Sequence, residues 1–372
     1  MTVLGFSAPG LRPALEIPVE VRGGDGTLVA RSTVGRSVVV EPGTYFVGAV
    51  LPAGQQLSAA VAADGDYVMA ELAPQHAASP GGGGMAVRDL LLGAEAPVVP
   101  ERVRLRLLAG NLLRGELDVV QDREALADHE AVIDYRPPGG GRPLYAELLQ
   151  PDHRSRTRAV PVAPRQARAC ELRFFRKPDR SWSVDVHLQH SGADLLCRYR
   201  DGGRVEQAAT VAGTLEGSEQ MLLRKLRDPV AAAVGAYSLL RFASLDRLHD
   251  WTGNLRAWFA WLPDGSAIHG EHLAREGEHR LALDAFLELE ERGLPLFSDG
   301  LAFAIARLEL YGSIGAPTFD RLTLRRAAAL VAALRVFARS TDFGHPLLAF
   351  AGDPQALAAA AASALAGPPR TA

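Results

Sequence analysis

The chain has 372 residues, of which 48% are hydrophobic, and its formal net charge is −3 at pH 7. This length suits two or three domains, each large enough to bury a core. The small net charge argues against non-specific binding to acidic polymers or surfaces, so we expect no nucleic-acid partner and no membrane partner.

Segments in which apolar and polar residues alternate predict a small β-sandwich over residues 1–75. Turn residues at 23–26, 41–43 and 64–66 divide this region at the spacing expected of a sandwich or barrel. The predicted strands cover residues 15–21, 28–34, 36–40, 43–50, 57–62 and 67–72.

One hairpin in this region has a recognisable pattern. The segment from Val38 to Val47 contains Glu41-Pro42-Gly43-Thr44-Tyr45 at its turn. It resembles a recurrent hairpin of transthyretin-like and carboxypeptidase-regulatory-like β-sandwich modules, and the resemblance covers about 15–72. It implies a structural or adhesive module without an active site.

Residues 76–98 form a Gly/Pro-rich linker by composition, with four consecutive glycines at 81–84. A second β-rich domain is predicted over residues 99–213. Its Arg-rich part, 136–168, predicts a long exposed loop interrupted by a short strand at 144–149, and loops of this length are usually functional.

Alternation of apolar and polar residues carries the prediction of strands in this second domain. It is clear at 103–107, 182–188 and 195–199. The last two segments are expected to pair as a hairpin across a Ser191-Gly192 turn, with a further strand at 204–211.

Beyond residue 214, apolar residues recur every three or four positions, which predicts an α-helical domain over 214–372. Asp228-Pro229 is a strong helix start, with Asp as N-cap and Pro at the first helical position. The predicted helices cover residues 219–226, 230–242, 245–259, 265–276, 278–291, 299–311, 319–341 and 353–365.

The hydrophobic period therefore changes once, near residue 215. The fold class that follows is multidomain β + α, with an N-terminal β-sandwich-like domain, a second β-rich domain and a C-terminal all-α helical array. The segment Ala274–Phe286, with Gly277 between two helices, resembles a tetratricopeptide helix junction, and tetratricopeptide-like helices would cover about 265–311. No second copy occurs at that family's period, so a non-repetitive bundle or α-solenoid fragment is equally open.

Three histidines are weak candidates for a metal site. His269 and His272 are three residues apart and share a helical face, and His279 follows beyond Gly277. The order does not match His-Glu-x-x-His, which a metalloprotease helix uses. A solvated helix face explains these residues better, so no metal ligand is predicted, and a metal-dependent hydrolase using His269/His272 is kept as an alternative.

No other pattern predicts an enzyme. The chain lacks Gly-x-Ser-x-Gly, a phosphate-binding loop and a dinucleotide-binding fingerprint. Cys170 and Cys197 suit buried thiols better than a disulfide, and Cys197 suits a structural thiol better than a catalytic pair with His187 or His190. No signal peptide or membrane span is apparent. We therefore expect a cytoplasmic protein that is not an enzyme and has no cofactor.

Two surfaces are the candidate partner-binding sites. Trp251 and Trp258 lie seven residues apart on one helical face, with Arg256 between them, and tryptophan often anchors interfaces. The other is an exposed loop at 151–168 that carries Arg154, Arg156 and Arg158.

From these surfaces we predict a non-enzymatic interaction or adaptor protein of a bacterial multiprotein system. Its partner would be a protein, for example a protease or a signalling enzyme, bound by the helical domain and exposed loops. The other alternative is a protease substrate or regulatory subunit cut in the Arg-rich loop, since cleavage needs extended backbone.

Overall fold

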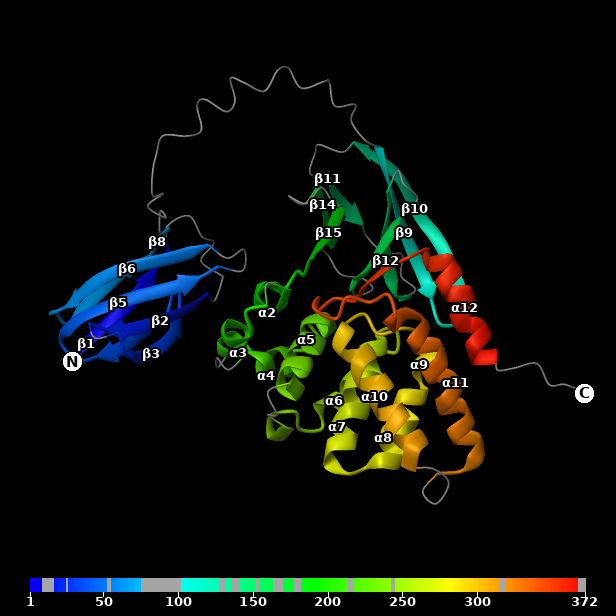
Figure 1. Cartoon of the computed structure of the whole chain (residues 1–372). Helices are drawn as coiled ribbons and strands as arrows, with labels where there is room; N and C mark the ends of the chain where they lie inside the picture. Colours follow the sequence, from blue (N-terminus) through cyan, green and yellow to red (C-terminus); the bar gives the residue numbers. More distant parts are fainter. Residues whose placement is uncertain are drawn as a thin grey trace, which may run out of the picture. The chain divides into compact units, whose positions relative to one another are not determined.

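The computed structural model describes the chain except for residues 9–16, 25, 52–54, 75–101, 127–130, 136–140, 151–153, 163–169, 177–181, 202, 213–216, 242–244, 315–318 and 367–372. The chain divides into two compact units, Met1–Glu101 and Arg102–Ala372. Strands predominate in the first half of the chain and helices in the second, which confirms the predicted fold class (Figure 1). The predicted linker at 76–98 lies outside the described residues.

The first unit contains two β-sheets that share one apolar core. Their strand orders are β4-β1-β7 and β3-β2-β5-β6-β8. Buried side chains from both sheets, including Leu4, Val19 and Val47, form a single hydrophobic cluster. The strands are β1 (Thr2–Ser7), β2 (Pro18–Gly23), β3 (Leu28–Thr33), β4 (Ser37–Val40), β5 (Gly43–Val50), β6 (Gln56–Ala63), β7 (Tyr67–Glu71) and β8 (Ala73–Pro74).

The six strands predicted for this unit correspond to β2–β7. The sequence prediction missed β1, the central strand of its sheet, because Gly5 interrupts the alternation of its side chains. In the structure a Cβ on Gly5 would collide with the hydroxyl of Tyr67, so glycine leaves room for this ring to cover the strand.

The second unit contains two antiparallel sheets, with strand orders β10-β9-β12-β13-β16 and β11-β14-β15. The strands are β9 (Arg102–Asn111), β10 (Glu116–Leu126), β11 (Ala131–Tyr135), β12 (Leu144–Leu149), β13 (Ser155–Val160), β14 (Cys170–Arg176), β15 (Trp182–His187) and β16 (Ala349–Ala351).

Helices make up the rest of this unit, and Figure 1 shows α5 to α11 gathered beside these sheets. They are α2 (Ser191–Asp201), α3 (Val205–Ala212), α4 (Ser218–Leu223), α5 (Pro229–Arg241), the 3-10 helix η1 (Leu245–Arg247), α6 (Trp251–Trp258), α7 (Pro263–Glu276), α8 (His279–Leu287), α9 (Leu289–Arg292), α10 (Ser298–Ile314), α11 (Arg321–Ala338) and α12 (Pro354–Ala366). Among the described residues, no helix has the length and apolar character needed to cross a bilayer.

The prediction of strands at 195–199 and 204–211 is wrong, because both segments are helical. Five residues of alternating character fit either period, so the pattern alone could not decide. In α2 the helix is favoured over a strand because the Ala193 amide donates to His190 Nδ1 at its start, and Arg198 pairs with Asp194 one turn earlier.

The predicted exposed loop at 151–168 is also wrong for residues 155–160. These residues form β13, which lies between β12 and β16 and is buried at five of its six positions. Residues 151–153 and 163–168 of the predicted loop lie outside the described residues.

A short strand from the C-terminal region completes the larger sheet. β16 lies between α11 and α12 in the sequence and pairs with β13, from Arg156 opposite Ala351 to Arg158 opposite Ala349. Side chains from β9, β12 and most of the helices belong to one hydrophobic cluster. The predicted boundary at 213/214 therefore falls inside the second unit.

Gly235 on α5 permits close packing against α4, because a Cβ there would collide with the Ser218 carbonyl oxygen. We expect Gly235→Ala to lower the free energy of unfolding in urea by about 1–3 kcal/mol. Gly312→Ala on α10 is the matched control, since nothing lies within 4 Å of its added Cβ. It should raise stability by about 0.5 kcal/mol, because alanine loses less backbone entropy in a helix. The opposite order of the two variants would contradict this packing.

Candidate functional site

The two tryptophans of α6 hold a lysine between them. Lys225 Nζ lies 5.4 Å from the ring centroid of Trp251 and 5.5 Å from that of Trp258. Both rings therefore face the turn after α4, as their seven-residue spacing predicts. Burial lowers the pKa of Lys225, while the charge of Asp250 acts in the opposite direction. A cation between two aromatic faces fixes both rings by cation–π attraction.

Exposed apolar side chains lie in the same part of the chain. Trp258 is 54% exposed, and Leu226, next to Lys225, is 75% exposed. Leu223 at the end of α4 is also exposed, and α4 contacts α6. We call Leu223, Lys225, Leu226, Trp251 and Trp258 the α4–α6 patch. Grouped exposed apolar residues are typical of interaction sites.

Arg256, the third residue predicted on this surface, is engaged within the fold. Its Nε donates to Glu288 Oε2 at 2.9 Å, and its Nη2 donates to Oε1 of the same carboxylate. Ser266 Oγ also donates to Glu288. Burial raises the pKa of Glu288, but these bonds outweigh it and hold the pKa below its usual range. Arg256 therefore ties α6 to the end of α8.

The three arginines predicted in the loop differ in exposure. Arg154 and Arg156 are exposed, whereas Arg158 is buried. Arg158 Nη1 donates to the Val184 carbonyl and Nη2 to Asp201 Oδ2, each at 3.0 Å. Arg158 thus joins β13 to β15 and to the end of α2, which a partner-binding loop residue would not do.

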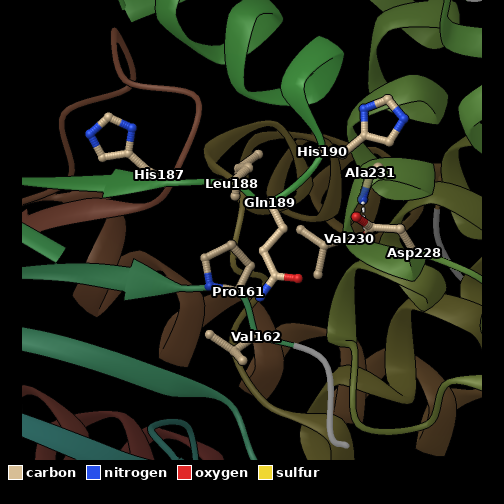
Figure 2. A pocket seen from close by; sticks show the side chains of 9 residues that line it. All are labelled: Pro161, Val162, His187, Leu188, Gln189, His190, Asp228, Val230 and Ala231. Atoms are coloured by element: carbon tan, nitrogen blue, oxygen red, sulfur yellow. Dashed lines mark hydrogen bonds between the residues drawn. The ribbon is translucent and has the colours of Figure 1, made fainter. Parts of the chain in front are cut away.

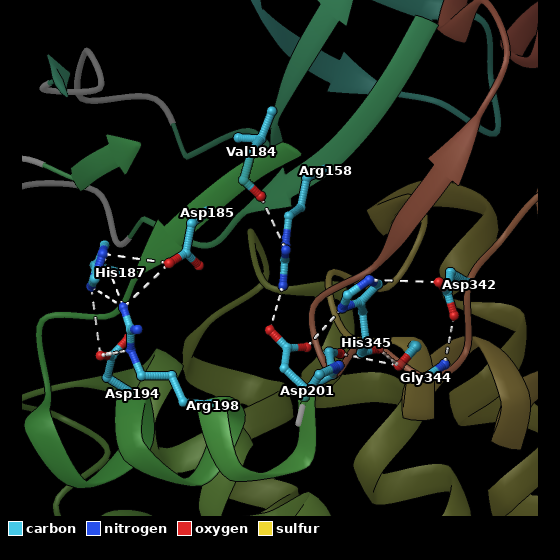
Figure 3. Close-up of polar contacts among 12 residues, drawn as sticks. Arg158, Val184, Asp185, His187, Asp194, Arg198, Asp201, Asp342, Gly344 and His345 are labelled. Atoms are coloured by element: carbon cyan, nitrogen blue, oxygen red, sulfur yellow. Dashed lines mark hydrogen bonds and ion pairs between the residues drawn. The ribbon is translucent and has the colours of Figure 1, made fainter. Parts of the chain in front are cut away.

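Asp201 links Arg158 to a histidine near the C-terminus. His345 Nδ1 lies 2.9 Å from Asp201 Oδ1, and Figure 3 shows the three side chains pointing toward one another. Burial raises the pKa of Asp201, but His345 and Arg158 outweigh it and keep the pKa below its usual value. His345 Nε2 lies 3.5 Å from Asp342, so both ring nitrogens face carboxylates.

A second polar cluster, also drawn in Figure 3, lies at the start of α2. Arg198 pairs with Asp194 at 2.8 Å and Asp185 at 3.4 Å, and His187 lies between these carboxylates. Asp194 also accepts the Leu188 amide at 2.9 Å. Asp185 and Asp194 each already pair with a cation or an amide donor, so we interpret the cluster as a structural connection between β15 and α2.

The pocket in Figure 2 is too small for a substrate. Its volume is about 10 Å³, which is roughly the space that one water occupies. His187 and His190 lie on either side of it in the figure. Its lining residues are Pro161, Val162, His187, Leu188, Gln189, His190, Asp228, Val230 and Ala231.

The candidate metal ligands do not converge. Thr252 Oγ1 lies 3.1 Å from His269 Nδ1 and 2.9 Å from His272 Nδ1, so one hydroxyl bridges both rings. His279 is exposed and contacts the ring of Tyr311 instead. Within the described part of the chain, no group of three or more His, Cys, Asp or Glu side chains is placed to hold a metal ion.

Burial explains the electrostatics of these histidines and of the buried thiol. Burial, with the nearby charge of Arg256, lowers the pKa of His269 to about 4, and burial also lowers the pKa of His272. Cys197 on α2 is a free thiol whose pKa burial raises to about 12. A protonated, buried thiol is a poor nucleophile, which weighs against a catalytic pair of Cys197 with a histidine.

Asp264 in the first turn of α7 is fully buried. Its Oδ1 accepts from the Tyr237 hydroxyl at 2.7 Å, and its Oδ2 accepts from the Leu296 amide at 2.9 Å. Burial raises its pKa to about 6, because these hydrogen bonds offset only part of the desolvation. A perturbed carboxyl can mark a functional site, but Asp264 does not line the pocket in Figure 2.

The raised pKa of Asp264 predicts a pH dependence of stability. Between pH 3.8, the ordinary pKa of an aspartate, and about pH 6, Asp264 holds a proton in the folded chain and has lost it in the unfolded chain. The stability from this group is therefore full below pH 3.8 and is lost as the pH rises through about 6. Relative to Asp264→Asn, the unfolding free energy of the wild type should fall by on the order of 3 kcal/mol across this window. Urea titrations at several pH values measure this difference, and a pH-independent difference would contradict it.

Part of the chain is similar to known proteins. Residues 195–369, from α2 to the region after α12, match the family described as the Y4kD C-terminal domain. A stretch of 110 residues is 36% identical to a probable protease of a Desulfuromonadales bacterium. That stretch is 30% of this chain and 13% of the relative, so the match covers a small part of the longer protein. No solved structure matches the chain.

Three residues that the structure brings to these sites were not predicted from the sequence: Lys225, Asp201 and His345. Lys225 is an isolated lysine in an Arg-rich chain, and its position seven places after Ser218 gives no sign of the tryptophans it meets. No sequence pattern relates Asp201 to His345, which is far away in the sequence.

Proposed function

We propose that this chain is a non-catalytic module that binds a protein partner through the α4–α6 patch, in a bacterial system that includes a protease. The observation that carries the proposal is the pair of tryptophans held by Lys225, with Trp258 more than half exposed. Tryptophan dominates the binding energy of many interfaces, because its ring buries a large area at a small cost in side-chain entropy.

The patch is also held ready for binding. Lys225 is only 5% exposed, so its charge stays between the rings and keeps Trp258 in one orientation. A ring that is already fixed loses little freedom when a partner covers it, which favours affinity. An unsupported tryptophan on a mobile side chain would lack this advantage.

Backbone strain at the start of α6 supports the same surface. His249 has φ of 47°, in the left-handed region that non-glycine residues rarely adopt. Its ring lies 4.6 Å from that of Trp251, and its Nε2 lies 3.5 Å from Glu219. Strained residues are concentrated at functional sites, where surrounding contacts hold them in place.

The charges around the patch favour a particular kind of partner. Arg224 and Arg227 are exposed on either side of Lys225 and Leu226 in the turn after α4. A partner segment that combines apolar side chains with acidic ones would cover Trp258 and Leu226 and meet these cations. Such complementary charge raises association rates and excludes basic competitors.

The comparisons support the protease context. The stretch shared with the Desulfuromonadales protein is a small part of a larger chain named a probable protease. Sharing one limited segment in this way is typical of a module used in several proteins. We infer that the module here acts beside a protease, and that the chain's own residues supply recognition rather than catalysis.

The test uses two substitutions on the patch, Trp258→Ser and Leu226→Asp, with Leu322→Asp on α11 as control. Leu322 is 69% exposed, so the control matches the charge change at an unrelated exposed leucine. Partners are captured from the native bacterium by crosslinking and identified by mass spectrometry, and their affinity for purified variants is then measured.

We expect to capture a protein that contains a protease. Its affinity should fall at least about tenfold in both patch variants, because hot-spot residues such as tryptophan contribute about 2 kcal/mol or more. Its affinity for Leu322→Asp should equal that for the wild type. Capture that is equal in all four proteins would contradict the proposed surface. A partner that binds through the patch but belongs to no protease system would contradict the proposed context.

A further inference from the structure

A larger pocket lies beside the Arg158–Asp201–His345 connection. Its volume is about 120 Å³, and β13, β15, β16 and the segment after α11 supply its walls. A cavity of roughly 150 Å³ holds a ligand the size of benzene. The pocket therefore has room for inorganic phosphate or a short carboxylic acid, and it is too small for a nucleotide.

Hydrogen-bond donors without acceptors line this pocket. The guanidinium of Arg156 is exposed on β13, and no bond joins it to another side chain among the residues that the structure describes. Arg158, which is 8% exposed, has a buried Nε without a hydrogen-bond partner. A buried donor left without an acceptor costs about 1–3 kcal/mol, so an acceptor near this guanidinium would be favoured.

The two arginines are placed to act together. Positions 156 and 158 lie two residues apart on one strand, so their side chains leave β13 on the same face. Arg158 is fixed by Val184 and Asp201, whereas Arg156 is free to close on a ligand. Planar guanidinium groups match the oxygen geometry of phosphate and carboxylate.

The acidic groups nearby do not fill the site. Asp201 is engaged by Arg158 Nη2 and by His345 Nδ1, and its lowered pKa keeps it ionised in those bonds. Asp342 is 67% exposed, and its Oδ1 accepts the Gly344 amide at 3.0 Å. It therefore contributes negative charge at the rim of the pocket and leaves the donors inside it unused.

We propose that this pocket binds a small oxyanion, phosphate or carboxylate, between the guanidinium groups of Arg156 and Arg158. The site is distinct from the α4–α6 patch and does not rest on the proposed function. It assigns Arg156 the role of closing on the anion and Arg158 the role of a fixed donor, with Ser183 and His345 among the remaining lining residues.

Isothermal titration calorimetry of the full chain with inorganic phosphate, and separately with acetate, tests the proposal at constant ionic strength. We expect saturable binding of at least one of them. Arg156→Gln should weaken it at least tenfold, because it removes an exposed guanidinium that makes no side-chain bond within the described part of the chain. Arg325→Gln, an exposed arginine on α11, is the matched control and should bind as the wild type does.

A second variant separates binding from a structural effect. Asp342→Asn keeps an oxygen for the Gly344 amide and removes the charge at the rim, so it should strengthen anion binding several-fold. A purely structural role for this segment would leave binding unchanged or weaken it. The absence of saturable binding by either anion, or equal affinity in the wild type and Arg156→Gln, would overturn the proposal. Preference for phosphate or acetate would identify which oxyanion the site takes.

Discussion

The burial of α7 is the constraint on which the helical part of the protein depends. Ten of its fourteen residues are buried, among them Asp264, Glu271 and His272. Each of these polar groups needs a partner, since an unpaired buried charge would cost more than the helix could offset. The partners come from different neighbours: Tyr237 of α5 for Asp264, Arg307 of α10 for Glu271, and Thr252 of α6 for His272. α7 therefore fixes the positions of the helices around it.

Small residues along α7 allow this arrangement. A Cβ on Gly265 would press on the backbone of Arg256, and one on Gly270 would press on the ring of Phe286. α6 and α8 can therefore approach closely from two sides. The packing of α7 thus determines the position of α6, which carries the tryptophans of the α4–α6 patch. α7 itself contributes no residue to that patch. Core and surface are connected here by steric fit and by the Thr252 hydroxyl.

Local patterns predicted much of the fold and little of the sites. Asp228-Pro229 begins α5 as expected, because the Asp228 side chain accepts the Ala231 amide at 2.9 Å. The seven-residue spacing of the tryptophans also placed them on one face. The errors arose where the deciding contacts are distant: β13 is a strand because β12 and β16 flank it, and Arg158 is buried because Asp201 and Val184 receive it. A single sequence gives no signal for such pairs.

The pairing of β13 with β16 has a consequence for biosynthesis. A ribosome completes β9, β12 and β13 before it reaches Ala349, so this edge of β13 lacks its partner strand while residues 161–348 are synthesised. Unpaired strand edges attract other chains, and contacts of such large sequence separation form slowly. The nascent protein would therefore depend on β16, or on a chaperone occupying its place, to avoid aggregation at this edge.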